Sequence, residues 1–402
     1  MDFETIAFQN PHWYGKHDVP PEKRRFFYEF IKGLDNRMIY TIRGLRRVGK
    51  STLLKQLINY IIKERKIDPS AILYFSFDES KAEPKEVITA WASRLGMNIR
   101  TAKLFVFFDE IQKVDDWGNK IKLLYDNSAI KFFLSGSSAL MLKKGKESLA
   151  GRELEFELRP FTFNEWLEFK KINPALSSWK LYEQYLFRQL PELAVNLELD
   201  HVPYTRAIVN KVVDSDIPDL FGLGHADRLR EICFSLYKQP GQIIDYNDIA
   251  KDFSINRETA SKYMDAAVSS YLLRKLYNYS KNARKSEKSA KKFYPYSSTL
   301  VSAIFPYPVD LSLIVETDVG FQLGAEYFWN SKGREIDFIV GSNFDCGVEV
   351  KFRNNITNSD IRTLNNNPLK LNKRIVVVKP SSKFEVSAKC VYPYNLVDYA
   401  VY

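Results

Sequence analysis

The stretch Gly44-Leu45-Arg46-Arg47-Val48-Gly49-Lys50-Ser51 decides the fold of this chain. It matches G-x-x-x-x-G-K-[ST], the pattern of a phosphate-binding loop. A β-branched and aromatic run, residues 38–42, precedes it, and an amphipathic run, residues 52–57, follows it, so the predicted order is strand, loop, helix. A chance match is the alternative, and this flanking order argues against it. In such a loop backbone N–H groups surround the phosphates of ATP, Lys50 reaches the β- and γ-phosphates, and the Ser51 hydroxyl ligates Mg²⁺. We expect ATP to contact Gly44, Leu45, Arg46, Arg47, Val48, Gly49, Lys50, Ser51 and Thr52.

An apolar run that ends in two acids supplies the second half of such a site. Residues 104–108 predict a buried strand, and Asp109 and Glu110 follow it directly. Asp109 is the candidate to hold Mg²⁺, and Glu110 is the candidate to orient or deprotonate the attacking water. A solvated turn is the alternative for an isolated Asp-Glu pair, but here the phosphate-binding loop lies upstream.

Polar residues also follow the next apolar run, residues 131–134. Ligands of open α/β sheets bind at the carboxyl ends of the strands, so Ser135 or Ser137 could sense the γ-phosphate or position water. Alternatively, these serines cap a short helix over residues 139–141. Arg152 is a candidate to neutralise charge in the transition state, either in its own chain or in a neighbouring copy. The alternative is an ordinary surface arginine.

Composition limits the class of protein. A chain of 402 residues favours two or three domains, and its apolar runs fall short of the roughly 20 residues that span a bilayer. We expect no membrane partner. The first five residues lack the basic start and apolar core of a secretory signal, so the cytoplasm is the expected location. Three widely spaced cysteines suggest neither disulfides nor zinc. A net charge of +10 is compatible with a polyanionic partner.

With these motifs in place, the chain resembles a family of archaeal and bacterial AAA-type ATPases. The resemblance rests on residues 42–51, 109–113, 135–138, 149–152 and 159–163, and it covers most of the chain. It implies an α/β fold: a P-loop NTPase core of AAA type with a parallel sheet, then a helical and winged-helix segment, then a restriction-endonuclease-like α/β domain. The implied divisions are 1–165 for the ATPase domain, 166–222 for a helical lid or spacer, 223–282 for the winged helix and 283–402 for the nuclease-like domain.

A winged helix-turn-helix is predicted over residues 226–279, with helices over 229–237, 244–252 and 256–272. Asn256 is placed to cap the third helix, on which Arg257 and Lys262 would face nucleic acid. The stretch from Arg274 to Lys292 holds eight basic residues and one acid, and its Lys281, Arg284 and Lys285 are further candidates for phosphate contact. A protein-contact helix and a solvated connector are the alternatives.

Two predicted strands, residues 335–340 and 347–351, form a hairpin that carries acids and a lysine. Glu349 and Lys351 are two residues apart and share one face of a strand, and Asp337 on the neighbouring strand can join them. This is the PD-(D/E)xK nuclease pattern, in which Asp337 and Glu349 would ligate Mg²⁺ and Lys351 would stabilise charge, with Glu316 as a possible fourth member. The alternative is a solvated ion-pair face. The family usually has an Asp after the aromatic run at residues 293–296, where this chain has Ser297.

Two interpretations of function remain open. The first is a Mg²⁺-dependent ATPase that acts on nucleic acid, with DNA favoured over RNA and with possible cleavage by the C-terminal domain. The second is a nucleotide-controlled switch that binds DNA or protein through a catalytically inactive nuclease-like domain. A homo-oligomer that uses Arg152 in a neighbouring copy is a further option.

Overall fold

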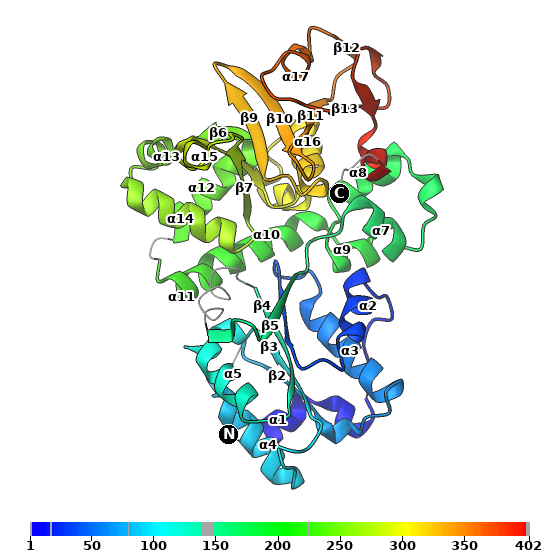
Figure 1. The fold of residues 1–402 in the computed structure, drawn as a ribbon, viewed down its shortest axis with the longest axis vertical. Helices are drawn as coiled ribbons and strands as arrows, with labels where there is room; N and C mark the ends of the chain where they lie inside the picture. The colour runs from blue at the N-terminus through cyan, green and yellow to red at the C-terminus, as the bar shows by residue number, and fades with distance from the viewer. Residues whose placement is uncertain (1, 17, 79, 138–147, 224–225, 399–402) are drawn as a thin grey trace. The chain divides into compact units, whose positions relative to one another are not determined.

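The computed structural model describes residues 2–16, 18–78, 80–137, 148–223 and 226–398 (Figure 1). The chain divides into two compact units, Met1–Arg159 and Pro160–Tyr402. This division lies close to the expected boundary after residue 165. The predicted helix over residues 139–141 lies outside the described residues.

The first unit is built on a five-stranded sheet in the order β2-β3-β4-β1-β5, and its pairings are parallel. The strands are β1 (Ile39–Arg43), β2 (Ile72–Ser76), β3 (Phe105–Asp109), β4 (Lys131–Gly136) and β5 (Glu153–Glu157). The helices and single turns are α1 (Phe3–Phe8), η1 (Pro11–Tyr14), α2 (Arg25–Lys32), α3 (Lys50–Lys63), η2 (Pro69–Ala71), α4 (Pro84–Leu95), η3 (Ile111–Lys113) and α5 (Trp117–Asp126). The strands predicted over 38–42, 104–108 and 131–134 are confirmed, and so is the helix after the loop.

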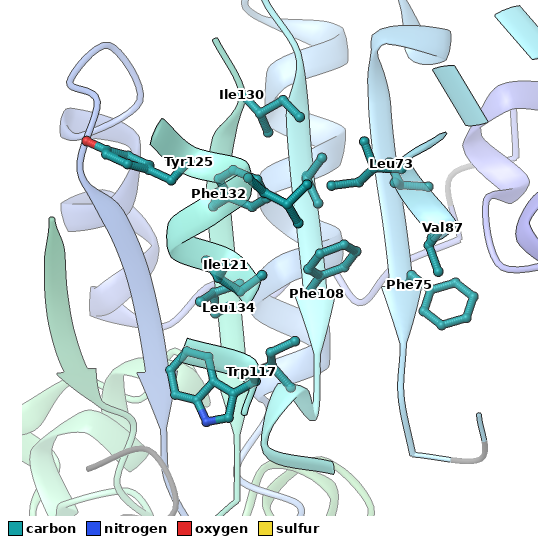
Figure 2. Packing of buried hydrophobic residues seen from close by; sticks show 14 of the residues in the cluster. Leu73, Phe75, Val87, Phe108, Trp117, Ile121, Tyr125, Ile130, Phe132 and Leu134 are labelled. Carbon is teal, nitrogen blue, oxygen red and sulfur yellow. The ribbon is translucent and has the colours of Figure 1, made fainter. Parts of the chain in front are cut away.

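Apolar side chains alternate between the two faces of this sheet because successive strand residues point to opposite sides. On one face Phe108 and Phe132 pack with Trp117 and Ile121 of α5 (Figure 2). On the other face Phe107 and Phe133 stack with ring centroids 4.7 Å apart. Burial on both faces explains why β3 and β4 read as continuous apolar runs in the sequence.

The N-terminal segment covers the free edge of β2. Asn10 donates from Nδ2 to the Tyr74 carbonyl at 2.8 Å and accepts from the Tyr74 N–H at 2.7 Å. The Ser76 N–H donates to Gln9 Oε1 at 2.7 Å. These side chains satisfy an edge strand that would otherwise expose its backbone, and they fix the position of Tyr74.

The second unit begins with a helical segment, as predicted from Trp166 to about Phe221. Its elements are α7 (Phe163–Phe169), η4 (Pro174–Leu176), α8 (Trp179–Leu186), α9 (Pro191–Val195), α10 (His201–Lys211), the π-helical turn η5 (Val212–Asp216) and α11 (Ile217–Phe221).

The next segment has the order helix, strand, helix, helix, hairpin, which is the topology of a winged helix. It comprises α12 (Ala226–Lys238), β6 (Gln242–Ile244), α13 (Tyr246–Asp252), α14 (Arg257–Ser269), β7 (Leu273–Asn278), α15 (Ala283–Lys288) and β8 (Lys291–Pro295). The predicted second and third helices were too long, because Ile244 belongs to β6 and because α14 ends at Ser269, with residues 270–272 in the turn before β7. The α14 cap is confirmed, since Asn256 Oδ1 accepts from the Thr259 N–H at 2.8 Å.

The C-terminal part completes an eight-stranded sheet in the order β15-β13-β11-β10-β9-β7-β8-β6. Its elements are η6 (Ser298–Ile304), α16 (Leu311–Gln322), β9 (Tyr327–Ser331), β10 (Arg334–Val340), β11 (Cys346–Lys351), β12 (Asn355–Thr357), α17 (Arg362–Asn365), β13 (Lys373–Val378), β14 (Lys383–Glu385), β15 (Lys389–Val391) and η7 (Pro393–Asp398). The predicted hairpin is confirmed as β10 and β11, paired antiparallel.

One sheet therefore runs through the winged helix and the C-terminal part. Strand β7 pairs antiparallel with β8 and parallel with β9. The expected division after residue 282 falls between β7 and β8, inside this hairpin. Local sequence patterns do not reveal the β7–β9 pairing because its two strands are separated by about fifty residues.

A buried carboxylate joins the helical segment to α16. Asp318 accepts hydrogen bonds from Tyr182 at 2.5 Å, Tyr185 at 2.9 Å, Gln189 at 2.6 Å and Gln322 at 2.7 Å. Burial raises the pKa of Asp318 to about 6, and the four donors only partly oppose this. No helix in the described part of the chain combines the length and apolar character needed to cross a membrane.

Candidate functional site

The loop between β1 and α3 has the backbone shape that a phosphate site requires. Gly44 and Gly49 have φ values of 153° and 98°. A Cβ atom on Gly44 would lie 2.2 Å from the Leu158 carbonyl oxygen, so only glycine fits between β1 and the end of β5. Gly49 precedes α3 and has no side chain to cap it, which leaves the first N–H groups of α3 to meet an anion.

Lys50 is held at the centre of this loop. Its ammonium donates to the carbonyls of Gly44 at 2.9 Å and Leu45 at 3.2 Å, and it lies 3.7 Å from Glu110 Oε1. Arg24 braces the loop from outside through a 3.1 Å hydrogen bond to the Val48 carbonyl. The lysine is thus buried, and a β- or γ-phosphate could replace the carbonyl oxygens and the carboxylate as partners of its ammonium.

Asp109 ends β3 beside the loop. Its Oδ1 accepts from Ser135 Oγ, and its Oδ2 accepts from the Tyr74 hydroxyl at 2.8 Å. Burial, followed by the charge of Asp109, raises the pKa of Tyr74, whereas a hydrogen bond with Ser51 lowers it. Tyr74 therefore donates to Asp109 and lies beside Ser51, the two candidate ligands of Mg²⁺. A hydroxyl and a carboxylate are oxygen ligands of the kind that Mg²⁺ prefers, so these residues fit the ion.

Glu110 is the neighbouring buried acid. Its Oε2 accepts from Gln112 Nε2 and, at 2.9 Å, from Ser137 Oγ. Burial raises the pKa of Glu110, but the charge of Lys50, the Gln112 hydrogen bond, the charge of Arg46 and the Ser137 hydrogen bond outweigh burial, so the pKa lies below its usual value. Glu110 is therefore ionised at neutral pH, as a residue that polarises water must be.

The structure brings Lys50, Asp109, Glu110 and Ser137 to one edge of the sheet. It adds two residues that the sequence analysis missed, Tyr74 and Gln112. A tyrosine on a neighbouring apolar strand gives no sequence signal for this contact. Gln112, two residues after Glu110, could have been suspected from its position in Asp109-Glu110-Ile111-Gln112.

The candidate arginines lie in different places. Arg46 forms a 3.2 Å ion pair with Asp78 near the loop, and Arg47 is exposed with a φ of 67°. Arg152 directly precedes β5, and its backbone carbonyl pairs with Ile39 at the start of β1. In a parallel sheet that is the edge opposite the loop. Its guanidinium pairs with Asp126 at 2.9 Å, so the structure does not bring Arg152 to the nucleotide site of its own chain.

In the second unit Asp337, Glu349 and Lys351 do converge. Asp337 Oδ2 accepts from the Val350 N–H at 2.9 Å, and Lys351 Nζ lies 2.5 Å from Glu349 Oε1. Glu316 of α16 belongs to the same cluster, as its electrostatic interaction with Asp337 indicates. We refer to Glu316, Glu335, Asp337 and Glu349 as the carboxylate cluster.

Lys292 of β8, which the sequence analysis treated as part of a basic surface stretch, is buried against this cluster. Its ammonium lies 2.7 Å from Glu335, 3.0 Å from Glu316 and 3.3 Å from Asp337. Burial lowers the pKa of Lys292, but interaction with Tyr294, Asp337 and the two glutamates raises it well above its usual value. Arg274 and Lys291 of the same stretch are also buried.

The cluster as it stands does not fit a metal ion. Within the described ranges, no group of three or more His, Cys, Asp or Glu side chains is arranged to hold one. Glu349 is nevertheless unusual, because its Oε2 is buried and accepts no hydrogen bond from the described residues. Burial, then repulsion from Asp337, raises the pKa of Glu349 to about 8.

The candidate nucleic-acid residues are exposed. Arg257 and Lys262 lie on α14, near the exposed acids Glu258 and Asp265. Three further candidates, Lys281, Arg284 and Lys285, lie at the tip of the β7–β8 hairpin.

Lys291 anchors this tip. Its ammonium donates to the carbonyls of Ser286 at 2.9 Å, Glu287 at 2.7 Å and Ser289 at 2.6 Å, and so holds the end of α15.

Comparison with known proteins agrees with this geometry. Residues 36–167 match the family model described as an AAA domain. The first unit is an AAA-type P-loop domain. Residues 180–309, which span the winged helix, match a model described as a domain of unknown function.

Similar proteins extend beyond the AAA domain. An uncharacterized protein of Methanocaldococcus jannaschii is 29% identical over 313 residues, which is 68% of this chain and 66% of that protein. A second one from that organism is 26% identical over 368 residues, 82% of this chain and 78% of that protein. An uncharacterized protein of Haemophilus influenzae is 24% identical over 267 residues, 64% of this chain and 66% of that protein. The chain thus spans just under two thirds of the first and third relatives.

Solved structures similar to the chain include the Aeropyrum pernix ORC2 protein, at 10% identity and a TM-score of 0.41 over 77% of this chain and 98% of that one. DnaA from Aquifex aeolicus is another, at 14% identity and a TM-score of 0.33 over 65% of this chain and 92% of that one. Identities and TM-scores this low carry no argument about function.

Proposed function

We propose that the protein is a Mg²⁺-dependent ATPase that acts on nucleic acid. The observation that carries the first part is the convergence of Lys50, Asp109 and Glu110 at the loop between β1 and α3. The N–H groups of residues 44–52 bind the phosphates, and Lys50 neutralises charge on the β- and γ-phosphates. Ser51 and Asp109 would hold Mg²⁺, which would supply charge stabilisation to the phosphoryl group.

Glu110 orients the attacking water and accepts its proton. Gln112 and Ser137 fix the carboxylate of Glu110 through the hydrogen bonds to Oε2, so Ser137 can couple the position of Glu110 to a bound γ-phosphate. If the protein is a homo-oligomer, Arg152 of one copy is available to the site of the next only after it leaves Asp126.

Nucleic acid, with DNA favoured, is the proposed partner of the winged helix. The exposed Arg257 and Lys262 of α14 and the basic hairpin tip support this assignment. The tip is the stronger candidate, because Glu258 and Asp265 dilute the charge of α14.

The decisive test is steady-state ATP hydrolysis by wild type, Lys50→Ala and Glu110→Gln, with and without duplex or single-stranded DNA. Each variant should lose at least about 100-fold in kcat. Lys63→Ala, at the exposed far end of α3, is the matched control and should behave as wild type. Turnover in Lys50→Ala at the wild-type rate would contradict the assignment.

Cleavage of nucleic acid is a second candidate function. The convergence of Asp337, Glu349 and Lys351 and the unpartnered Glu349 Oε2 favour it. Linear, circular and branched DNA should then be cut with Mg²⁺ or Mn²⁺ by wild type and not by Asp337→Ala, while ATP hydrolysis persists in both. Absence of cutting together with DNA-stimulated ATP hydrolysis would favour the switch with an inactive nuclease-like domain.

A further inference from the structure

Lys292 places a positive charge inside the carboxylate cluster. Its side chain is only 3% exposed, and its ammonium lies within 3.3 Å of carboxylate oxygens from three residues, Glu316, Glu335 and Asp337. An ammonium group has three N–H donors. Each donor therefore has a carboxylate partner, as in a complete coordination shell for a cation.

Lys292 engages Asp337, one of the two carboxylates that the nuclease pattern assigns to a metal ion, and Glu316, its possible fourth member. Asp337 Oδ1 contacts the lysine, while Asp337 Oδ2 already accepts the Val350 N–H. A divalent cation binds carboxylate oxygens at roughly 2.0–2.6 Å. An ion on Asp337 Oδ1 would thus lie within a few ångströms of the ammonium, and like charges at that separation repel strongly in a buried site.

The composition of the cluster agrees with this competition. Four carboxyl groups face two ammonium groups, Lys292 and Lys351. Removal of Lys292 would leave one ammonium group among the four acids and would free Asp337 Oδ1 for another cation.

Strand β8 fixes Lys292 in this position. Two residues on, Tyr294 faces the same side and donates to Glu316 at 2.6 Å. The neighbouring Lys291 points to the other side and holds α15. The lysine is thus supplied by a rigid strand of the winged helix rather than by a mobile loop.

We propose that Lys292 is the resident cation of the carboxylate cluster and excludes a divalent cation from it. The inference concerns the residues of the second candidate function, Asp337, Glu349 and Lys351, and is an alternative to it: metal-dependent cutting by wild type that Asp337→Ala abolishes would contradict the inference. Lys292 is a positioning residue in this arrangement: it holds Glu316, Glu335 and Asp337 together as a metal ion would. The C-terminal site then lacks a divalent ion while Lys292 is in place.

Mn²⁺ binding to the full chain tests the proposal without relying on activity. We would measure it by electron paramagnetic resonance on nucleotide-free protein that carries Asp109→Asn, which removes the metal ligand of the AAA domain. Lys292→Met should gain one Mn²⁺ site per chain, with Kd lowered on the order of 100-fold relative to the same protein with Lys292. Adding Asp337→Asn should abolish that site.

Lys351→Met is the charge-matched control. It removes the same charge from the cluster, but Lys351 contacts Glu349 rather than Asp337. Its effect on Mn²⁺ affinity should be much smaller than that of Lys292→Met. Equal tightening in both variants would reduce the role of Lys292 to general electrostatics and overturn the proposal.

Tight Mn²⁺ binding by the protein that keeps Lys292 would also refute the proposal. So would a Kd for Mn²⁺ that is the same in Lys292→Met as in the protein that keeps Lys292. Circular dichroism would check that each variant is folded. Lys292→Gln, which keeps a hydrogen-bond donor without the charge, carries the same expectation if Lys292→Met does not fold. The Lys50→Ala assay tests the proposed ATPase function separately, and its result does not depend on this titration.

Discussion

Substitution of Asp318 by asparagine should change how stability depends on pH. Asp318 is fully buried, and its partners Tyr182, Tyr185, Gln189 and Gln322 are neutral donors. Its pKa rises from the usual 3.8 to about 6 because burial disfavours the ionised form. The folded state therefore binds more protons than the unfolded state between these values, and stability must fall as pH rises through this window.

The magnitude follows from linkage. A difference between 3.8 and about 6, at about 1.36 kcal/mol per pH unit, corresponds to about 3 kcal/mol in total, of which about 2 kcal/mol is lost between pH 4.5 and 7. Asp318→Asn keeps the shape and cannot ionise. The free energy of unfolding of wild type minus that of Asp318→Asn should therefore fall by about 2 kcal/mol over this range.

Urea unfolding followed by circular dichroism at several pH values would measure this difference. Asp360→Asn is an opposite-sign control, since the Thr357 backbone hydrogen bond lowers the pKa of Asp360. A wild-type-minus-Asp318→Asn difference that is flat with pH, or that rises, would refute the argument that burial outweighs the four donors.

Two further outcomes test the candidate sites. Tyr74→Phe removes the 2.8 Å hydrogen bond to Asp109, and a hydrogen bond to a charged group contributes about 1.5–3 kcal/mol. The Mg²⁺ concentration for half-maximal ATP hydrolysis should therefore rise by about tenfold or more. An unchanged Mg²⁺ requirement would exclude Tyr74 as a positioning residue. Arg284→Ala and Lys285→Ala should each reduce the slope of log affinity for DNA against log salt by about 0.9, measured by fluorescence anisotropy, whereas Arg228→Ala, paired with Glu231 on α12, should leave the slope unchanged.

The AAA domain was the most predictable part of the chain. Its loop and acidic strand follow motifs that allow few residue types at fixed spacing, so Lys50, Asp109 and Glu110 could be predicted individually. Tyr74 could not, because its role depends on β2 lying beside β3. The position of Arg152 could not be predicted either. The sequence does not show that Arg152 lies at the start of β5, at the end of the sheet away from the loop.

The carboxylate cluster of the C-terminal part was also predicted only where its residues are close in the sequence. Asp337, Glu349 and Lys351 lie on one hairpin, so local spacing predicted their meeting. Lys292 reaches them from a strand that is separated from β10 in the sheet by β9 and β7. In the sequence it is one of eight basic residues between Arg274 and Lys292, and its burial among acids follows only from the tertiary pairing.

The shared sheet also means that the winged helix and the C-terminal part cannot be cut apart without breaking strand pairings. Strand β7 has β8 on one side and β9 on the other, so it belongs equally to the winged helix and to the C-terminal part. A chain that ended after residue 282 would lose β8 and with it both the anchor of the basic tip, Lys291, and the cation of the carboxylate cluster, Lys292. A chain that began there would leave β8 without its partner β7 and β9 with an open edge, which is a recognised cause of aggregation. Adjacent residues of β8 therefore hold the hairpin tip and the carboxylate cluster from opposite faces of one strand.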